Sequence, residues 1–351
     1  MQDYAVNEVP NLEFLVGTYT LPGANGGGVH HVRLPTDAPG EAEVRLVAEA
    51  ANPSWVTTLT GSKVVVAAEE VARGARIMTW AWGNGTLTPL GMAEVPGAGP
   101  CHAGAHPSLP LIATAHYVDG TAALWRVTEG LPKLLQRFAF DGSGPVKGRQ
   151  EASHAHFAMF FDDGRGLAIT DLGGDAIHFY DVDDTANPVA CQTRRLDLPP
   201  GSGPRHIAAG RDALFVSCEL DETVRTLVQD GDGYRVAAEI APFSPVAGAG
   251  GALSGIRMSP DGKSVFVAGR NQTAIVRLRV GADGRLEPDT VFDCGGRHPR
   301  DFAFDPSGRW MVVANQHSDG LALFEIDPSG PIRPRGTVPI GSPACTLFNG
   351  A

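Results

Sequence analysis

A short apolar pattern recurs seven times along the chain, and this repeat constrains the fold more than any other feature. The copies include FLVGTYT, VVVAAEE, LIATAHY and WMVVANQ, and successive copies are about 50 residues apart, a period typical of repeat architectures. Each copy has the composition of a β-strand. The seven strands are expected to end near Tyr19, Glu70, Tyr117, Leu172, Glu219, Arg270 and Gln316.

A second strand pattern precedes each of these strands. In four units it begins with a proline, at Pro53, Pro100, Pro204 and Pro299. Turn sequences such as SPDGKS and DPSGRW separate the two patterns, and their Asp, Pro, Ser and Gly residues favour a hairpin. Two further strand-like runs complete most units, and no segment has a convincing helical periodicity. Each unit is therefore predicted to contain four antiparallel strands.

Seven such units predict an all-β fold, a seven-bladed β-propeller that forms one domain over residues 1–351. The C-terminal run GSPACTLF resembles a first strand, whereas the N-terminal FLVGTYT is a second strand without a first. We therefore expect the N- and C-terminal strands to pair in one blade and close the ring. A pair of β-sandwiches is the alternative, but it explains neither the seven copies nor the complementary termini.

The overall charge limits the partners of the protein. A formal charge of −11 argues against nucleic acid and anionic membranes, because both bind basic surfaces. The N-terminus lacks a signal-peptide pattern, and no apolar run is long enough for a membrane helix. The five cysteines are scattered and form no CxxC pair. We expect a cytoplasmic protein that is a monomer or a weak homo-oligomer.

The two strand patterns are expected to meet at one mouth of the central channel, because the first strand of each blade lines the channel and the second runs antiparallel to it. Several cations there, inside an acidic protein, favour a small anionic ligand. The polar residues expected at the mouth are His102, His154, His156, Arg205, His206, Glu219, Arg257, Arg270, Arg300, Asp301 and Gln316, with Tyr19, Glu70 and Tyr117 at the rim.

Motifs along nearly the whole chain carry a family resemblance. They include VGTYT (16–20), NPSW (52–55), GPCHAGAHP (99–107), SHAHFAMF (153–160), DLGGD (171–175), GPRH (203–206), CELDETV (218–224) and HPRDFAFDPSGRW (298–310). Together they resemble the seven-bladed lactonase family, typified by propeller-type 6-phosphogluconolactonases and including fungal 3-carboxymuconate lactonizing enzymes. The resemblance implies lactone chemistry in either direction. By motif it implies functional roles for His154, His156, Arg205, Glu219 and Arg270.

The chemistry of lactone opening is consistent with these residue types. Water attacking a carbonyl needs a base, and the developing oxyanion needs a cation or a donor. A histidine can be the base. We favour His156 over His154, although strand alternation puts both on one face, and Glu219 is a third candidate. Arg205 can clamp a phosphate or carboxylate, and Arg270 and Arg300 can assist. The expected substrate-binding residues are His102, His206, Arg257, Arg300, Gln316 and Tyr19.

The sequence thus predicts a hydrolase that opens an anionic sugar lactone resembling 6-phosphogluconolactone, an activity of the pentose phosphate pathway. No metal or cofactor is expected, because the His-Ala-His pair lacks a third ligand at a diagnostic spacing. Two other functions remain open: a muconate-type lactonizing cycloisomerase that uses the same residues, and a non-catalytic metabolite-binding propeller. Arg205 and Glu219 can also be a purely structural ion pair.

Overall fold

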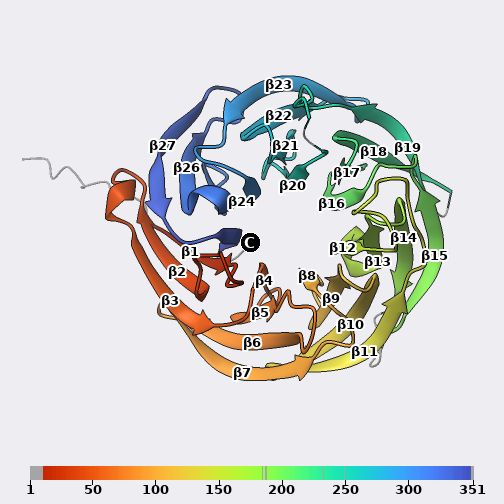
Figure 1. Cartoon of the computed structure of the whole chain (residues 1–351), viewed down its shortest axis with the longest axis horizontal. Coiled ribbons are helices and arrows are strands. Elements are labelled where there is room, and N and C mark those ends of the chain that lie inside the picture. Colours follow the sequence, from red (N-terminus) through yellow and green to blue (C-terminus); the bar gives the residue numbers. More distant parts are fainter. Residues whose placement is uncertain (1–10, 184, 186–187, 232, 249, 349–351) are drawn as a thin grey trace, which may run out of the picture.

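The computed structural model describes residues 11–348 apart from 184, 186, 187, 232 and 249. Seven four-stranded antiparallel sheets surround a central axis, and the first strand of each sheet is the innermost (Figure 1). The predicted all-β, seven-bladed propeller is therefore confirmed. Within the described part of the chain, no helix is long and apolar enough to span a membrane.

The seven sheets are numbered here as blades. Blade 1 contains β4 (Trp55–Thr58), β5 (Val64–Ala68), β6 (Arg76–Gly83) and β7 (Thr86–Glu94), and blade 2 contains β8 (Pro100–Ala105), β9 (Leu111–His116), β10 (Thr121–Thr128) and β11 (Leu131–Ala139). Blade 3 contains β12 (Ala155–Phe161), β13 (Gly166–Asp171), β14 (Ala176–Val182) and β15 (Ala190–Asp197), and blade 4 contains β16 (Pro204–Ala209), β17 (Leu214–Cys218), β18 (Thr223–Asp230) and β19 (Gly233–Ile240). Blade 5 contains β20 (Leu253–Met258), β21 (Ser264–Gly269), β22 (Ala274–Val280) and β23 (Leu286–Asp293), and blade 6 contains β24 (Pro299–Phe304), β25 (Trp310–Asn315), β26 (Gly320–Ile326) and β27 (Ile332–Pro339). Blade 7 contains β28 (Pro343–Phe348), β1 (Asn11–Thr18), β2 (Gly28–Pro35) and β3 (Glu43–Glu49). The described residues also form three 3₁₀ turns, η1 (Pro39–Glu41), η2 (Asp162–Gly164) and η3 (Gln316–Ser318).

Blade 7 is built from both ends of the described chain, as the sequence predicts. β28 is its innermost strand and pairs antiparallel with β1, so that Phe348 lies opposite Phe14. The two phenyl rings have centroids 5.0 Å apart and lie in the apolar layer between blades 6 and 7. The C-terminal strand therefore closes the ring both by strand pairing and by side-chain packing.

Packing between blades explains why the second strand of each unit gives the strongest sequence signal. Seven buried apolar clusters lie between neighbouring blades, one for each contact around the ring. A second strand such as β21 is buried along its whole length because both faces pack against other blades. An outermost strand such as β19 alternates partly buried and exposed positions, since one of its faces meets solvent.

One backbone hydrogen bond recurs in all seven blades and fixes the end of the axis where the inner strands begin. A carbonyl just before the inner strand accepts the N–H of a residue just after the second strand, over distances of 2.7 to 3.1 Å. In six blades the two residues are immediately adjacent to the strands, and in blade 1 they are Asn52 and Glu70, which lie slightly farther from β4 and β5. The acceptors form one ring position, called the acceptor position below: Asn52, Gly99, His154, Gly203, Ala252, His298 and Ser342. The donors, called the donor position, are Tyr19, Glu70, Tyr117, Leu172, Glu219, Arg270 and Gln316.

The donor position coincides with the seven strand ends expected from the sequence. The repeat therefore located one ring of residues correctly in all blades, and this ring surrounds the end of the axis that we call the site end.

Because β28 closes the ring, truncating Phe348, the last aromatic side chain of this strand, should destabilise the protein strongly. Replacing Phe348 by Ala should lower the free energy of unfolding by about 3–5 kcal/mol, because it leaves a cavity between blades 6 and 7. Urea unfolding followed by tryptophan fluorescence measures the change. Leu46→Ala, at an exposed position on β3 of the same blade, is the matched control and should change stability by less than about 0.5 kcal/mol. Equal effects of the two substitutions would contradict the closing role of Phe348.

Candidate active site

β-Bulges near the starts of the inner strands place three polar residues at the site end. The pairing of β12 with β13 skips His156, that of β16 with β17 skips Arg205, and that of β24 with β25 skips Arg300. A bulge leaves the extra residue outside the regular ladder and redirects its side chain, which is why bulges are frequent beside functional sites. The strand start in each of these blades thus contributes a charged or titratable group to the axis.

Glu219 is the centre of the polar cluster at the site end. Its carboxylate is 2 % exposed, and Oε2 lies 2.8 Å from Nε of Arg205. Its Oε1 lies 2.8 Å from Nη2 of Arg270 and also accepts a hydrogen bond from Nη2 of Arg149. One buried carboxylate therefore holds three guanidinium groups from two blades and one inter-blade connection.

Electrostatics keep this cluster ionised at neutral pH. Burial alone would raise the pKa of Glu219, but Arg270, Arg205 and Arg149 outweigh it and hold the pKa well below its ordinary value. Burial lowers the pKa of Arg205 to about 10 in spite of Glu219, so Arg205 still carries its charge at pH 7. A carboxylate stabilised in this way is a weak base. The geometry therefore favours Glu219 as the residue that positions the arginines.

A second polar group lies on the opposite side of the axis, where blades 6, 7 and 1 meet. The Tyr19 hydroxyl donates to Oε2 of Glu70 over 2.7 Å, and Nη2 of Arg300 lies 3.6 Å from the same oxygen. The Arg300 guanidinium also sits over the Tyr19 ring, 4.8 Å from its centroid. The Arg300 side chain is 15 % exposed, whereas that of Arg205 is 2 % exposed.

Three buried histidines form an aromatic layer inside the arginine cluster. The His206 ring lies 5.2 Å from His156 and 5.8 Å from His102, measured between centroids, and its Nε2 is 3.0 Å from Nη1 of Arg205. Phe157 and Trp55 pack against His102, at 3.8 and 4.2 Å. Burial first, and the charge of Arg205 with it, lowers the pKa values of all three imidazoles far below neutrality. They are therefore neutral donors or acceptors.

His154 has a different environment from His156. It lies before β12 begins, and His156 is a bulge residue, so the strand alternation expected to put both on one face does not apply. The His154 ring stacks on Tyr117 at 4.5 Å, and its Nδ1 lies 2.6 Å from the Tyr117 carbonyl oxygen. A carbonyl only accepts, so Nδ1 carries the proton and Nε2 has the free lone pair.

Arg257 lies away from the Glu219 cluster. It sits near the end of β20, where it pairs with Phe266, four residues beyond the strand start. Its guanidinium bonds Oδ1 of Asp301 at 2.9 Å and lies over Trp55, 5.2 Å from the ring centroid. The structure thus pairs Arg257 with Asp301 deeper along the axis.

Gln316 is at the donor position of blade 6, and its N–H bonds the His298 carbonyl over 3.1 Å. Together with Tyr19 it also borders a neighbouring cavity of about 470 Å³, which Leu21, Asn25 and His317 help to line. The predicted residues Gln316 and Tyr19 therefore connect the arginine cluster with space that a ligand can enter.

Sequence reasoning missed Arg149, which belongs to the connection between β11 and β12. This connection is outside the repeated positions, so the repeat gave no signal for it. The next residue, Gln150, is 1 % exposed and holds the connection in place: its Nε2 donates to the Leu172 carbonyl at 2.9 Å and to Oδ1 of Asp175 at 2.8 Å. A buried glutamine beside an arginine is a weak sequence signal, and only the fold shows that Arg149 reaches Glu219.

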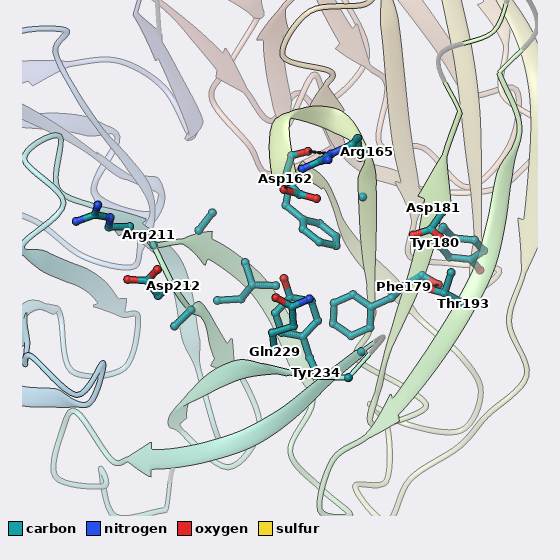
Figure 2. Close-up of a pocket in the computed structure, with 18 residues that line it drawn as sticks. Asp162, Arg165, Phe179, Tyr180, Asp181, Thr193, Arg211, Asp212, Gln229 and Tyr234 are labelled. Atoms are coloured by element: carbon teal, nitrogen blue, oxygen red, sulfur yellow. Dashed lines mark hydrogen bonds and ion pairs between the residues drawn. The ribbon is translucent and has the colours of Figure 1, made fainter.

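A cavity of about 630 Å³ between blades 3 and 4 contains none of the predicted site residues. Figure 2 shows the Asp162–Arg165 pair on one side of it, with Phe179 and Tyr234 on another. It lies at the turn that ends β12, whereas His156 is at the start of that strand. The cavity is therefore at the opposite end of the axis from the Glu219 cluster. No group of three or more His, Cys, Asp and Glu side chains within the described residues is arranged to hold a metal ion.

The fold and the Glu219 cluster define a seven-bladed propeller with a polar, arginine-rich site at one end of its axis. Residues 13–348 match the family described as "Lactonase, 7-bladed beta-propeller". The chain belongs to this lactonase family, as its motifs indicated, and it is a lactonase-type hydrolase.

Named relatives span nearly all of the chain. The 6-phosphogluconolactonase of Bacillus subtilis (strain 168) is 28% identical over 345 residues, which are 95% of this chain and 97% of that protein. The solved structure of a periplasmic gluconolactonase from Pseudomonas aeruginosa superposes with a TM-score of 0.86 at 26% identity, covering 97% of this chain and 99% of that one. A putative 6-phosphogluconolactonase from Bacteroides fragilis NCTC 9343 gives 0.87 at 27% identity, with coverages of 99% and 100%.

The charge state of Glu219 predicts a pH-dependent contribution to stability. Because its folded pKa is depressed, the contribution is complete above the unfolded pKa of about 4.3 and is lost as the pH falls below that value. Glu219→Gln leaves three arginines without their carboxylate, and it should destabilise the protein by about 3 kcal/mol at pH 7.

Urea unfolding at several values between pH 7 and pH 3 tests this expectation. The gap in stability between wild type and Glu219→Gln should narrow below about pH 4, since the unfolded wild-type chain then binds a proton that folded Glu219 does not. Glu43→Gln is the control, because its carboxylate is 75% exposed and it should show no such gap. A gap that stays constant down to pH 3 would mean that the charge of Glu219 does not stabilise the fold.

Proposed function

We propose that this lactonase hydrolyses an anionic sugar lactone, with 6-phosphogluconolactone as the expected substrate. The observation that carries the proposal is the excess of positive charge in the site. Four guanidinium groups meet only two carboxylates there, those of Glu219 and Glu70, while the neighbouring histidines are neutral. The excess of two positive charges suits a phosphate dianion, and it occurs in a protein whose formal charge is −11.

The arginines are proposed to bind the anionic group and to stabilise the oxyanion. Arg205 and Arg270 are held by Glu219, so their donors are oriented before the substrate arrives. Arg300 stays partly exposed beside Tyr19 and can add a further contact. Orientation in advance lowers the cost of reorganisation during the reaction, and a guanidinium fork matches phosphate and carboxylate oxygens.

We propose His154 as the general base, in place of the His156 favoured on sequence grounds. The hydrogen bond from Nδ1 to the Tyr117 carbonyl leaves the Nε2 lone pair free to accept a proton from water. His156 is 6 % exposed and lies against Arg205, which opposes the positive charge that a base must acquire. His156 is better suited to packing against His206 inside the arginine cluster.

The substrate proposal predicts a preference for the phosphorylated lactone. Purified protein should hydrolyse freshly prepared 6-phosphogluconolactone with a kcat/KM well above that for gluconolactone, with spontaneous hydrolysis subtracted from both. Arg205→Lys keeps the charge but loses the fork, and it should lower kcat/KM by about 10²–10³-fold.

Arg225→Lys is the matched control for Arg205→Lys, because Arg225 is also buried and ion-paired in blade 4 but lies outside the cluster. It should keep wild-type kinetics. Equal kcat/KM values for the two lactones would mean that the protein does not recognise the phosphate. The substrate would then be a neutral sugar lactone, the type named for the Pseudomonas relative. Turnover of neither lactone would contradict the proposal and favour muconate-type cyclisation.

The base assignment predicts different effects for the two histidines of the HAH motif. His154→Gln should lower kcat by about 10²–10⁴-fold, because the amide cannot accept the proton of the attacking water. His156→Gln should lower kcat less, through altered packing alone. The reverse pattern, with the larger loss of kcat in His156→Gln, would assign the base to His156.

A further inference from the structure

A histidine stands at a backbone position where most blades have a small or glycine residue. In five blades the residue at the acceptor position precedes a proline and has a positive φ, between 43° and 63°. These five residues are Asn52, Gly99, Gly203, His298 and Ser342. Glycine adopts this left-handed conformation without steric cost, and other residues are uncommon there, with Asn, Asp and His the most frequent among them. His298 has the largest side chain of the five.

The backbone hydrogen bond made at the acceptor position does not require the imidazole side chain of His298. The His298 carbonyl accepts the Gln316 N–H over 3.1 Å, and Gly203 makes the equivalent bond to Glu219 over 2.7 Å with no side chain at all. Three of the five residues, Asn52, His298 and Ser342, keep a side chain in this left-handed conformation, and only His298 brings an imidazole there.

The His298 side chain is next to the cations of the proposed active site. Its ring stacks on His317, with centroids 3.8 Å apart and planes 22° from parallel. Burial, followed by the charges of Arg270, His317, Arg300 and Arg205, lowers the pKa of His298 to about 3. The strongest charges that act on this imidazole are positive, so an arriving anion would meet arginines and a neutral ring.

His298 and His154 occupy the same acceptor position in two blades on opposite sides of the axis. Blade 3 carries His154 and blade 6 carries His298, and their inner strands β12 and β24 face each other across the ring in Figure 1. Addition of water to a carbonyl needs a base beside the water and a donor at the carbonyl oxygen, and the two histidines lie on opposite sides of the axis for these two roles.

We propose that His298 is a substrate-contacting residue that donates a ring N–H to the oxygen that becomes negative when water adds to the lactone carbonyl. This role rests on the proposed function. In the step, the water oxygen bonds to the carbonyl carbon, the carbonyl π electrons move to its oxygen, and His154 takes the water proton. When the ring C–O bond then breaks, His154 returns that proton to the leaving alkoxide, and His298 keeps its own proton throughout.

A neutral imidazole is well suited to this role. A protonated one would lose its proton readily beside three arginines, whereas the neutral ring keeps one N–H at every pH used for catalysis. Stacking on His317 limits the orientations available to the ring, which lowers the cost of ordering the donor when the oxyanion forms.

The test compares variants of the full-length protein with and without the donor. His298→Gly matches the residue at the same position in blades 2 and 4, so the backbone accommodates it, and His298→Phe keeps an aromatic ring against His317 but has no N–H. Both should lower kcat for the lactone by about 10²-fold with little change in KM, since the lost bond forms only in the transition state. His317→Asn removes the stacking partner and keeps the donor, and it should lose less than about tenfold.

Two results would overturn the inference. If His298→Phe or a folded His298→Gly keeps the wild-type kcat, His298 does not stabilise the oxyanion. If His317→Asn loses as much as His298→Phe, the packing of the pair matters and the N–H does not. Both results require an active wild type, so they are distinguishable from failure of the proposed function, in which wild-type protein opens neither lactone and this inference falls with it.

Discussion

The propeller depends on one repeated constraint, the hydrogen bond that ties the start of each inner strand to the end of the second strand. It joins the carbonyl before the inner strand to the N–H after the second strand, in all seven blades and with nearly the same length. Because the bond is made by backbone atoms, it requires no particular side-chain chemistry at either position, although the positive φ of five acceptor residues favours glycine. The same backbone bond therefore forms with very different side chains. Its acceptor is a glycine at Gly203 and a histidine at His154 and His298. Its donor in blade 4 is the charged residue Glu219.

The site end of the axis concentrates positive charge in an acidic protein. Glu219 gathers Arg149, Arg205 and Arg270, and without this shared carboxylate three guanidinium groups so close together would repel one another. The carboxylate neutralises only part of that charge, and the rest is available for an anion. The burial that stabilises the ion pairs also keeps His102, His156 and His206 neutral. The structural ion pair and the proposed functional cluster, considered as alternatives from the sequence, are the same group of residues.

The sequence located some site residues well and others poorly, for identifiable reasons. Arg205, Glu219 and Arg270 stand at repeated positions, and the structure brings them together. Arg257 follows the same repeat but lies too far along its strand, and it pairs with Asp301. The expected alternation of His154 and His156 failed because a bulge begins where the strand does. Arg149 lies in a connection that no repeat describes. The position of His298 before Pro299 is visible in the sequence, but its significance appears only by comparison with the equivalent residues of the other blades.

The sequence by itself determined the architecture: seven blades, four strands in each, and a ring closed by its terminal strands. It could do so because burial on both faces of the second strand leaves an apolar run in every unit, and a regular repeat of such runs has few folded solutions. The tertiary structure alone decided which polar side chains meet, because ion pairs such as that of Glu219 with Arg149 join residues far apart in the chain. It also decided which imidazoles are neutral, since their pKa values depend on burial and on neighbouring charges that no local pattern records.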